Sequence, residues 1–389
     1  MKVLSIIMAI VLIAGSLFVL PLSAEAVVVQ TRTVMFYVVG SNLESDYGCA
    51  TYNLVQSMES EYNENLNFIV MTGGSTGWNT EEEYLSGAEE VDSAYNQIWK
   101  LEGKRGGEEH GRMVLLESTG IEGYEQTLMS DPQVLTAFAD YCYTNYPADQ
   151  YDLILWDHGG GPASGFGCDN RIPNGNIMSL SQMMSAFSAT KLIEDNKKFE
   201  IIDFDACLMA SAEITEALEK YADYLVVSPE LEPGDGQEYT AWLNALKNNP
   251  SMNGYDLGKA IVDATMDYYT EGAGKGDDAT LSVIDTKNYM ERVYPWLCVL
   301  DEILIGEAKS VGRRNNRYNF YDEFYSLKKL YAYDAGGGSL VDLGNLAGAL
   351  SVPQTELKYH TGTAQSSGEP LYRRRCRDTE SSERQRRQR

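Results

Sequence analysis

The stretch YDLILWDHGGG, residues 151–161, is an apolar run that stops abruptly at an aspartate, a histidine and three glycines. Near-continuous apolar runs of this length are typical of strands that are buried on both faces of a parallel sheet. The same design, an apolar run that ends at a polar or turn residue, occurs in five other segments: Thr33–Val39, Asn67–Thr72, Phe199–Phe204, Tyr224–Ser228 and Ala279–Ile284. Together these runs predict a central, mostly parallel sheet.

Helical patterns lie between the predicted strands. Leu54, Met58 and Tyr62 recur with a spacing of four, and Asp131-Pro132 is a start signal in front of an apolar helix face. The remaining helical patterns are Ser179–Ala189, Leu208–Tyr221 and Tyr255–Tyr269. Strands that alternate with helices predict an α/β fold whose sheet is covered on both faces. The polar, glycine-rich stretch Lys100–Gly111 is expected to be an exposed loop.

The two ends of the chain differ from its body. Residues 1–26 combine Lys2, a long apolar run and Ala24-Glu25-Ala26, which is the pattern of a cleaved secretory signal. An uncleaved membrane anchor is the alternative, because the run is close to the length that spans a bilayer. We expect a signal peptide over 1–26, one folded domain over 27–362 and a disordered basic tail over 363–389, with a basic anchoring segment as the alternative for the tail. The chain is therefore expected to be secreted, with no other membrane span and with cell-surface association left open.

The net charge of −26 is unevenly distributed. Tyr372–Arg389 carries eight arginines against three acidic residues, so residues 27–371 carry −31. A body this acidic repels the phosphates of nucleic acids, which excludes them as partners. It attracts basic substrates weakly, in a way that salt screens. Solubility alone also accounts for such a charge.

One of the six cysteines has an unusual position. The cysteines form no C-x-x-C pair and no metal-like cluster with the three histidines. Cys207 directly follows the strand predicted over Phe199–Phe204 and precedes the helix predicted from Leu208. A helix N-terminus stabilises a thiolate, which is the nucleophilic form of cysteine. The sequence therefore indicates a nucleophile, whereas a buried structural cysteine is the alternative.

His158 favours the interpretation of Cys207 as a nucleophile. It also directly follows a predicted strand, and parallel sheets bind ligands at the carboxyl ends of their strands. Glycine lets the backbone approach a ligand closely, so the amides of Gly159 and Cys207 are candidate donors to an oxyanion. The alternative for His158 is a turn histidine whose ring is satisfied by the backbone.

The segments WDHGGG (156–161) and DFDACLMA (203–210) carry the two candidate catalytic residues and form a specific pair of motifs. With these two segments the chain resembles the clostripain family of cysteine peptidases, within the caspase and gingipain group. His158 precedes Cys207 by 49 residues, close to the interval of about 50 in caspases. The similarity covers about residues 31–350, and its other segments are TVMFYVVGSNLES (33–45), NFIVMTGG (67–74), the stretch 129–170, SPELEPGDGQEY (228–239), ATLSVID (279–285) and VDLGNLAGAL (341–350).

The resemblance implies a caspase-like three-layer α/β/α sandwich around a mostly parallel sheet, and an endopeptidase that cuts after Arg or Lys. His158 and Cys207 match the catalytic dyad of the family. Asp205 matches an acidic residue at the base of the substrate pocket, and Asp235 matches a second acidic wall. Two carboxylates favour a basic side chain, with Arg bound by a bidentate contact. The alternatives are a helix-capping role for Asp205 and a turn role for Asp235.

Three further points follow from the resemblance. Family members are often matured by cleavage in a loop after the histidine strand, which makes Arg171 a candidate self-cleavage site; a surface arginine is the simpler alternative. Some members require calcium, and since the sequence has many carboxylates but no EF-hand loop, a metal requirement is left open. From Val352 onward the sequence departs from the family, so its C-terminal part is expected to be truncated or replaced.

Two rival functions remain at this point. The first keeps the fold without the chemistry: a secreted protein that binds basic peptides in an acidic cleft and does not hydrolyse them. The second is a secreted esterase or glycosidase, since carboxylates, Tyr and Trp are plentiful. No carboxylate pair is as distinctive as the His–Cys pair.

Overall fold

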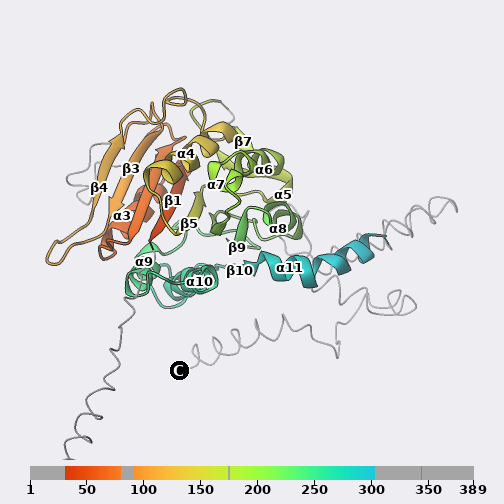
Figure 1. Ribbon diagram of the computed structural model, residues 1–389. Coiled ribbons are helices and arrows are strands. Elements are labelled where there is room, and N and C mark those ends of the chain that lie inside the picture. The colour runs from red at the N-terminus through yellow and green to blue at the C-terminus, as the bar shows by residue number, and fades with distance from the viewer. Residues whose placement is uncertain (1–30, 80–90, 174–175, 303–342, 344–389) are drawn as a thin grey trace, which may run out of the picture.

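The computed structural model of the chain (Figure 1) describes residues 31–79, 91–173, 176–302 and 343. The signal peptide expected over 1–26, the tail expected over 363–389 and all of the block 341–350 except Leu343 lie outside the described residues.

The centre of the molecule is an eight-stranded sheet of order β10-β9-β8-β5-β1-β2-β3-β4 (Figure 1). Its five inner strands, β9, β8, β5, β1 and β2, are parallel to one another, while β10, β3 and β4 pair antiparallel at the two ends. The strands are β1 (Arg32–Val39), β2 (Leu66–Gly73), β3 (Gln97–Glu102), β4 (Arg112–Glu117), β5 (Gln150–Trp156), β8 (Phe199–Asp205), β9 (Ala222–Val227) and β10 (Ser282–Asp285). The predicted mostly parallel sheet is confirmed.

Helices cover both faces of the sheet, and alternate residues of β1 show why. Met35, Tyr37 and Val39 belong to one apolar core, whereas Val34, Phe36 and Val38 belong to the other. Because successive side chains of a strand point to opposite faces, a strand with two buried faces is apolar throughout. The first core packs against α4 (Pro132–Asn145), α6 (Leu180–Ser188) and α8 (Ala212–Leu218), and the second against α3 (Cys49–Glu59), α9 (Tyr239–Asn248) and α10 (Gly254–Thr270).

Local capping signals position two of these helices as the sequence predicts. The carboxylate of Asp131 accepts a hydrogen bond from the Gln133 amide at the start of α4. Ser179 and Gln182 form a reciprocal capping box at the start of α6. Such caps satisfy amides that have no partner within the helix, so they specify where the helix begins.

Two local predictions are wrong. The helix expected over Leu208–Tyr221 is only the short α8, which begins at Ala212 after the cap residue Ser211. The loop expected over Lys100–Gly111 begins later, because residues 100–102 complete β3 and pair with β4. The sequence of β4, RMVLLE, alternates poorly, and Met113 is its one buried side chain. An edge strand of this kind has a weak apolar pattern and escapes prediction.

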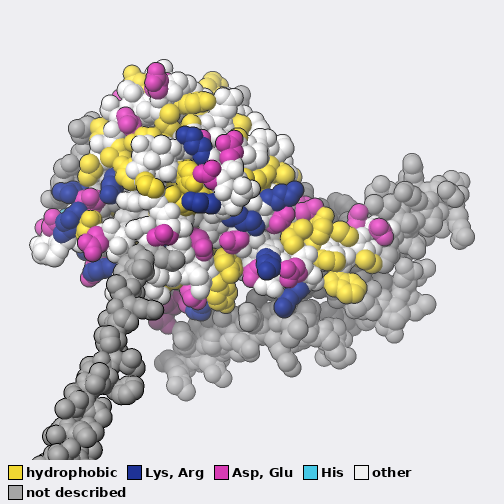
Figure 2. Space-filling model, in the orientation of Figure 1, with side chains coloured by type: hydrophobic (Ala, Val, Ile, Leu, Met, Phe, Trp, Pro, Cys, Tyr) yellow, Lys and Arg dark blue, Asp and Glu magenta, His cyan; other side chains and the backbone are white. Residues whose placement is uncertain are grey.

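The remaining elements are short: α2 (Ser41–Ser45), α5 (Gly161–Ser164), β6 (Phe166–Cys168), β7 (Ile177–Met178), α7 (Lys191–Glu194) and α11 (Thr286–Arg292). Within the described ranges, no helix is both long and apolar enough to cross a membrane. Figure 2 shows hydrophobic side chains gathered at the α11 end of the molecule, where Val293, Trp296 and Val299 are exposed.

Buried polar contacts also stabilise the sheet, and those of the Arg32 guanidinium involve a buried charge. Its guanidinium is buried and lies 2.6 Å from the Asp152 carboxylate on the neighbouring strand. It also donates to Gln150 Oε1 and to the carbonyl of Met252. Burial raises the pKa of Asp152 in spite of the attraction of Arg32. Desolvation therefore outweighs the charge pairing, and each partner depends on the other.

Replacing Arg32 alone is expected to destabilise the protein strongly, because it leaves the Asp152 carboxylate buried without its counter-charge. The variant Arg32→Met should lower the free energy of unfolding by about 3–5 kcal/mol, measured by urea denaturation. The double variant Arg32→Met/Asp152→Leu should recover much of that loss. A single variant as stable as the unchanged protein would contradict this account.

Candidate active site

His158 and Cys207 lie at the same edge of the sheet. Strands β5 and β8 are hydrogen-bonded in parallel, with Trp156 opposite Asp205. The amide of Asp157 still donates to the Asp205 carbonyl, 3.3 Å away, beyond the end of β5. His158 and Cys207 are thus the second residues after a matched pair, on adjoining strand ends. The structure brings together the two residues that the sequence singles out.

Cys207 lies in a tight turn and not at a helix N-terminus as expected, because α8 begins only at Ala212. The next residue, Leu208, has a φ of +65°, in the left-handed region that L-residues seldom adopt. Its amide donates to the carbonyl of Glu230 at 2.9 Å, and the amide of Ala210 donates to Ser228 at 2.8 Å. These two bonds anchor the turn to the loop after β9, so the strained residue is held by its surroundings.

The sulfur of Cys207 is half-buried and accepts a hydrogen bond from the amide of Glu232, 3.2 Å away. Burial raises the pKa of the thiol, and the amides of Glu232 and of Cys207 itself oppose that effect. The nearby Asp205 charge raises the pKa further. The thiol form is therefore favoured in this state, and backbone amides supply the stabilisation of the thiolate that a helix N-terminus was expected to supply.

His158 has a side-chain partner that the sequence analysis missed. Its Nε2 lies 2.9 Å from Oδ1 of Asn42 in α2. Since an amide oxygen only accepts, this contact places the ring hydrogen on Nε2 and leaves Nδ1 with a lone pair. Partial burial lowers the pKa of the imidazole, which favours its neutral form. Asn42 directly follows the strand end Gly40-Ser41, so the rule that ligands gather at carboxyl ends of parallel strands could have identified it.

The buried side chain of Asp157 holds the end of β5 in place through hydrogen bonds. Its buried carboxylate accepts from the Ser41 hydroxyl at 2.6 Å and from the Cys168 amide. Burial raises its pKa to about 8 although these donors lower it. The side chain therefore connects the turn after β1, the histidine loop and β6, and it holds the residue before His158 in place.

Gly159 approaches the backbone of Cys207 more closely than any other residue type could. A Cβ atom at Gly159 would lie 2.1 Å from the Cys207 carbonyl oxygen and 3.0 Å from its amide nitrogen. Real Cβ atoms do not approach backbone this closely, so the position requires glycine. The two residues predicted to form an oxyanion site are therefore in direct backbone contact.

The two predicted acidic residues differ in their surroundings. Asp205 is 4 % exposed, and its Oδ2 accepts from the Gln237 amide and the Tyr239 hydroxyl. Burial raises its pKa, and these donors partly offset the effect. Asp235 is exposed and accepts from the Tyr268 hydroxyl at 2.9 Å. The hydrogen bond from the Gln237 amide to Asp205 is not a helix cap, because the following helix α9 has Glu238 as its cap residue.

The loop that carries Asp235 lies against Asp205, since a Cβ atom at the adjoining Gly236 would be 2.9 Å from Oδ2 of Asp205. Cys49, half-buried in the first turn of α3, has a pKa raised to about 11 by burial and then by the charges of Asp235, Glu44 and Asp205. Asp235 also lies in a turn, since the Gly236 amide donates to the Pro233 carbonyl. The turn role and a pocket-wall role are therefore compatible for Asp235.

Arg171 is not a simple surface arginine. Its side chain is 13 % exposed and lies 2.6 Å from the fully buried carboxylate of Asp169. Its guanidinium also donates to the Thr127 carbonyl at 3.0 Å. For Arg171 to serve as a self-cleavage site, its side chain would have to leave Asp169.

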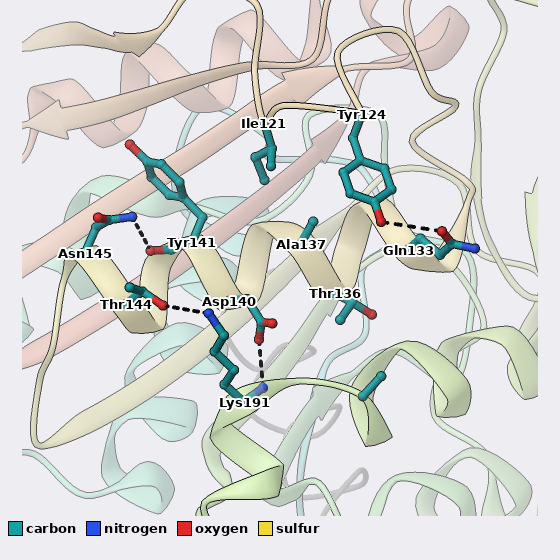
Figure 3. A pocket seen from close by; sticks show the side chains of 11 residues that line it. Ile121, Tyr124, Gln133, Thr136, Ala137, Asp140, Tyr141, Thr144, Asn145 and Lys191 are labelled. Atoms are coloured by element: carbon teal, nitrogen blue, oxygen red, sulfur yellow. Dashed lines mark hydrogen bonds between the residues drawn. The ribbon is translucent and has the colours of Figure 1, made fainter.

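No group of three or more His, Cys, Asp or Glu side chains in the described ranges is arranged to hold a metal ion. A groove on the outer side of α4 (Figure 3) is lined by residues that pair with one another. The amide of Lys191 donates to Asp140, and its ammonium group donates to Thr144. None of the predicted site residues lines this groove.

Comparison with known proteins agrees with the resemblance seen in the sequence. The sequence profile described as the clostripain family matches residues 36–362. Clostripain from Hathewaya histolytica is 27 % identical over 318 residues, which are 77 % of this chain and 54 % of clostripain. The chain thus spans about half the length of this relative.

Two solved structures are similar in part. An inactive zymogen of a C11 protease from Parabacteroides distasonis is 22 % identical, with a TM-score of 0.49, over 67 % of this chain and 64 % of that one. A secreted C11 cysteine protease from Bacteroides thetaiotaomicron, in complex with an irreversible peptide inhibitor, is 21 % identical with the same TM-score, over 67 % of each chain. The family profile covers most of the chain and includes both strand ends that carry His158 and Cys207, and on this match the chain belongs to the clostripain family.

Proposed function

We propose that this protein is a cysteine endopeptidase that cleaves peptide bonds after Arg or Lys, with Cys207 as nucleophile and His158 as acid–base partner. The observation that carries the proposal is the register of β5 and β8, which sets the two residues on adjoining strand ends in a member of the clostripain family. The acidic groups beside Cys207 supply the preference for a basic side chain.

In the proposed reaction the Cys207 thiolate attacks the carbonyl carbon of the scissile bond. The amides of Gly159 and Cys207, whose backbones touch, stabilise the oxyanion that develops. His158 takes up the thiol proton at Nδ1 while Asn42 holds Nε2–H, and then gives a proton to the leaving amine. The thioester that remains is hydrolysed by water, which His158 activates.

Substrate choice follows from charge. Asp205 lies two residues before the nucleophile, at the position that matches an acidic residue at the base of the substrate pocket in the clostripain family. Asp235 adds a second negative charge in the same neighbourhood, since the adjoining Gly236 lies against the Asp205 carboxylate. Opposite charge in a partly desolvated site favours Arg and Lys. With the leader expected over residues 1–26, these substrates are extracellular peptides or proteins.

Removal of either dyad member tests the proposal. Cys207→Ala is expected to abolish hydrolysis of an Arg-amide reporter, and His158→Ala to lower kcat by about 10²–10⁴-fold through loss of proton transfer. Cys298→Ser, which changes an exposed thiol, is the matched control and should retain full activity. Hydrolysis by the Cys207→Ala variant at the unchanged rate would refute the nucleophile. Binding of Arg peptides by the unchanged protein without any hydrolysis would instead favour an inactive binding protein.

The pH dependence of thiol reactivity tests the ionisation state of the site. Burial raises the pKa of Cys207 and lowers that of His158, so the free protein should hold a neutral thiol and a neutral imidazole near pH 7. Because the reactive thiolate forms as pH rises, alkylation of Cys207 by iodoacetamide should accelerate about tenfold per pH unit through neutrality. Mass spectrometry of the modified peptide measures this rate. A rate that is already maximal at pH 5–6 would indicate a preformed thiolate–imidazolium pair and contradict the expectation.

The contact between Gly159 and Cys207 yields a backbone test. Gly159→Ala should displace the Cys207 backbone and lower kcat for an Arg-amide reporter by at least about 10²-fold, the usual effect of losing one oxyanion donor. Gly106→Ala is the control, since a Cβ there meets no other atom. Melting temperatures of both variants separate loss of activity from unfolding. Equal activity of the two variants would show that the contact has no catalytic role.

A further inference from the structure

Glu232 places a carboxyl group in the interior beside the nucleophile. Its amide donates to the Cys207 sulfur, 3.2 Å away, so this residue touches the reacting atom through its backbone. The residue as a whole is only partly buried, but both of its carboxylate oxygens are buried. Within the described chain neither oxygen accepts a hydrogen bond from a neighbouring donor. A buried carboxylate without donors is costly, and such a group requires an explanation.

The groups around Glu232 are acceptors rather than donors. The Asp205 carboxyl faces that of Glu232, and Asp203 also acts on it through its charge. Oδ2 of Asp203 and Oε1 of Gln237 are likewise buried without a hydrogen-bond partner in the described chain. The neighbouring donors are engaged elsewhere: the Tyr239 hydroxyl and the Gln237 amide serve Asp205, and the Gln237 side-chain amide serves Asp203.

No basic side chain of the described residues forms an ion pair with Glu232, Asp205 or Asp203. The buried acids in other parts of the chain differ in this respect. Asp152 has Arg32 and Asp169 has Arg171, each at 2.6 Å. Glu44 accepts hydrogen bonds from Thr51 and Asn79. Asp152 keeps one oxygen without a donor but has the Arg32 cation, whereas Glu232, Asp205 and Asp203 have no ion-pair partner among the described residues.

The burial of Glu232 favours its protonated form in the free protein. Burial, followed by the charge of Asp205, raises the pKa of Glu232 well above its ordinary value. The two facing carboxyls can share a hydrogen bond only when one of them carries a proton. A bound cation with several N–H donors would satisfy the same oxygens and remove the repulsion between them. Guanidinium has five donors and ammonium three, so both fit the deficit.

We propose that Glu232 is a specificity-determining residue, whose carboxylate joins that of Asp205 to receive the charged end of the Arg or Lys side chain on the acyl side of the cut bond. This inference rests on the proposed function. Its geometric basis is that the Glu232 amide touches the attacking sulfur while both carboxylate oxygens of the same residue are buried without a donor in the described chain. Asp235, in contrast, is exposed and already accepts from Tyr268, so solvent screens its charge and it discriminates less strongly.

The experiment compares two chloromethyl ketone peptides that are identical except for Arg or its neutral isostere citrulline at the last residue. The second-order rate of Cys207 modification is measured by peptide mapping for each reagent. The unchanged protein should react faster with the Arg reagent. Glu232→Gln should reduce the Arg-to-citrulline ratio by at least about tenfold, as expected for loss of a charged hydrogen-bond partner, with little change in the citrulline rate. Glu232→Asp, which keeps the charge, should retain part of the preference.

The controls separate this role from a structural one. Glu122→Gln removes one exposed negative charge outside the site and should leave the ratio unchanged. Glu232→Gln should melt no lower than the unchanged protein, because it removes a buried carboxyl that has no counter-charge.

Three outcomes would overturn the inference. An unchanged ratio in Glu232→Gln would show that the residue takes no part in recognition. An equal loss of rate with both reagents, accompanied by a lower melting temperature, would assign Glu232 a structural role. If the unchanged protein showed no preference for Arg over citrulline, the proposed function itself would fail, independently of any variant.

Discussion

The parallel register of β5 and β8 is the constraint on which the rest of the site depends. With Trp156 opposite Asp205, each strand ends at the same level, and the next residues enter the same loop region. Backbone hydrogen bonds fix this register, and a shift by one residue would turn every side chain to the opposite face of the sheet. Strand β1 pairs with β5 on the other side, and Ser41 and Asn42 of the following helix α2 lie at the same edge.

Buried acidic side chains have different surroundings in the scaffold and near the candidate nucleophile. In the scaffold, acidic groups are compensated: Asp169 pairs with Arg171, and the Glu44 carboxylate accepts four hydrogen bonds. Near the nucleophile, burial raises the pKa values of Asp203, Asp205 and Glu232, and the described chain supplies no counter-ion. Uncompensated burial costs stability, and perturbed ionisable groups of this kind cluster where a protein binds or reacts. Folding therefore leaves an electrostatic deficit where a cationic substrate is proposed to bind.

Several parts of the fold could be predicted because their signals are local. The inner strands are apolar on both faces, and α4 and α6 carry capping residues at their first positions. Prediction failed where an apolar residue serves another purpose. Met209 looks like the start of a helix face, but it is buried in the core below a turn. Strand β4 was missed because it is an edge strand, where fewer side chains need to be apolar, and β3 because Gln97, Lys100 and Glu102 interrupt its apolar residues.

The sequence by itself determined the α/β class, the family resemblance and the positions of His158 and Cys207 at strand ends. Apolar runs, turn residues and short motifs act over a few residues, so they can be read without the fold. The tertiary structure alone decided which groups surround those two residues. Asn42 lies 116 positions from His158, and Glu232 lies 25 positions from Cys207. Hydrogen bonds and charges over such separations depend on how the chain returns to the sheet edge, which no local periodicity encodes.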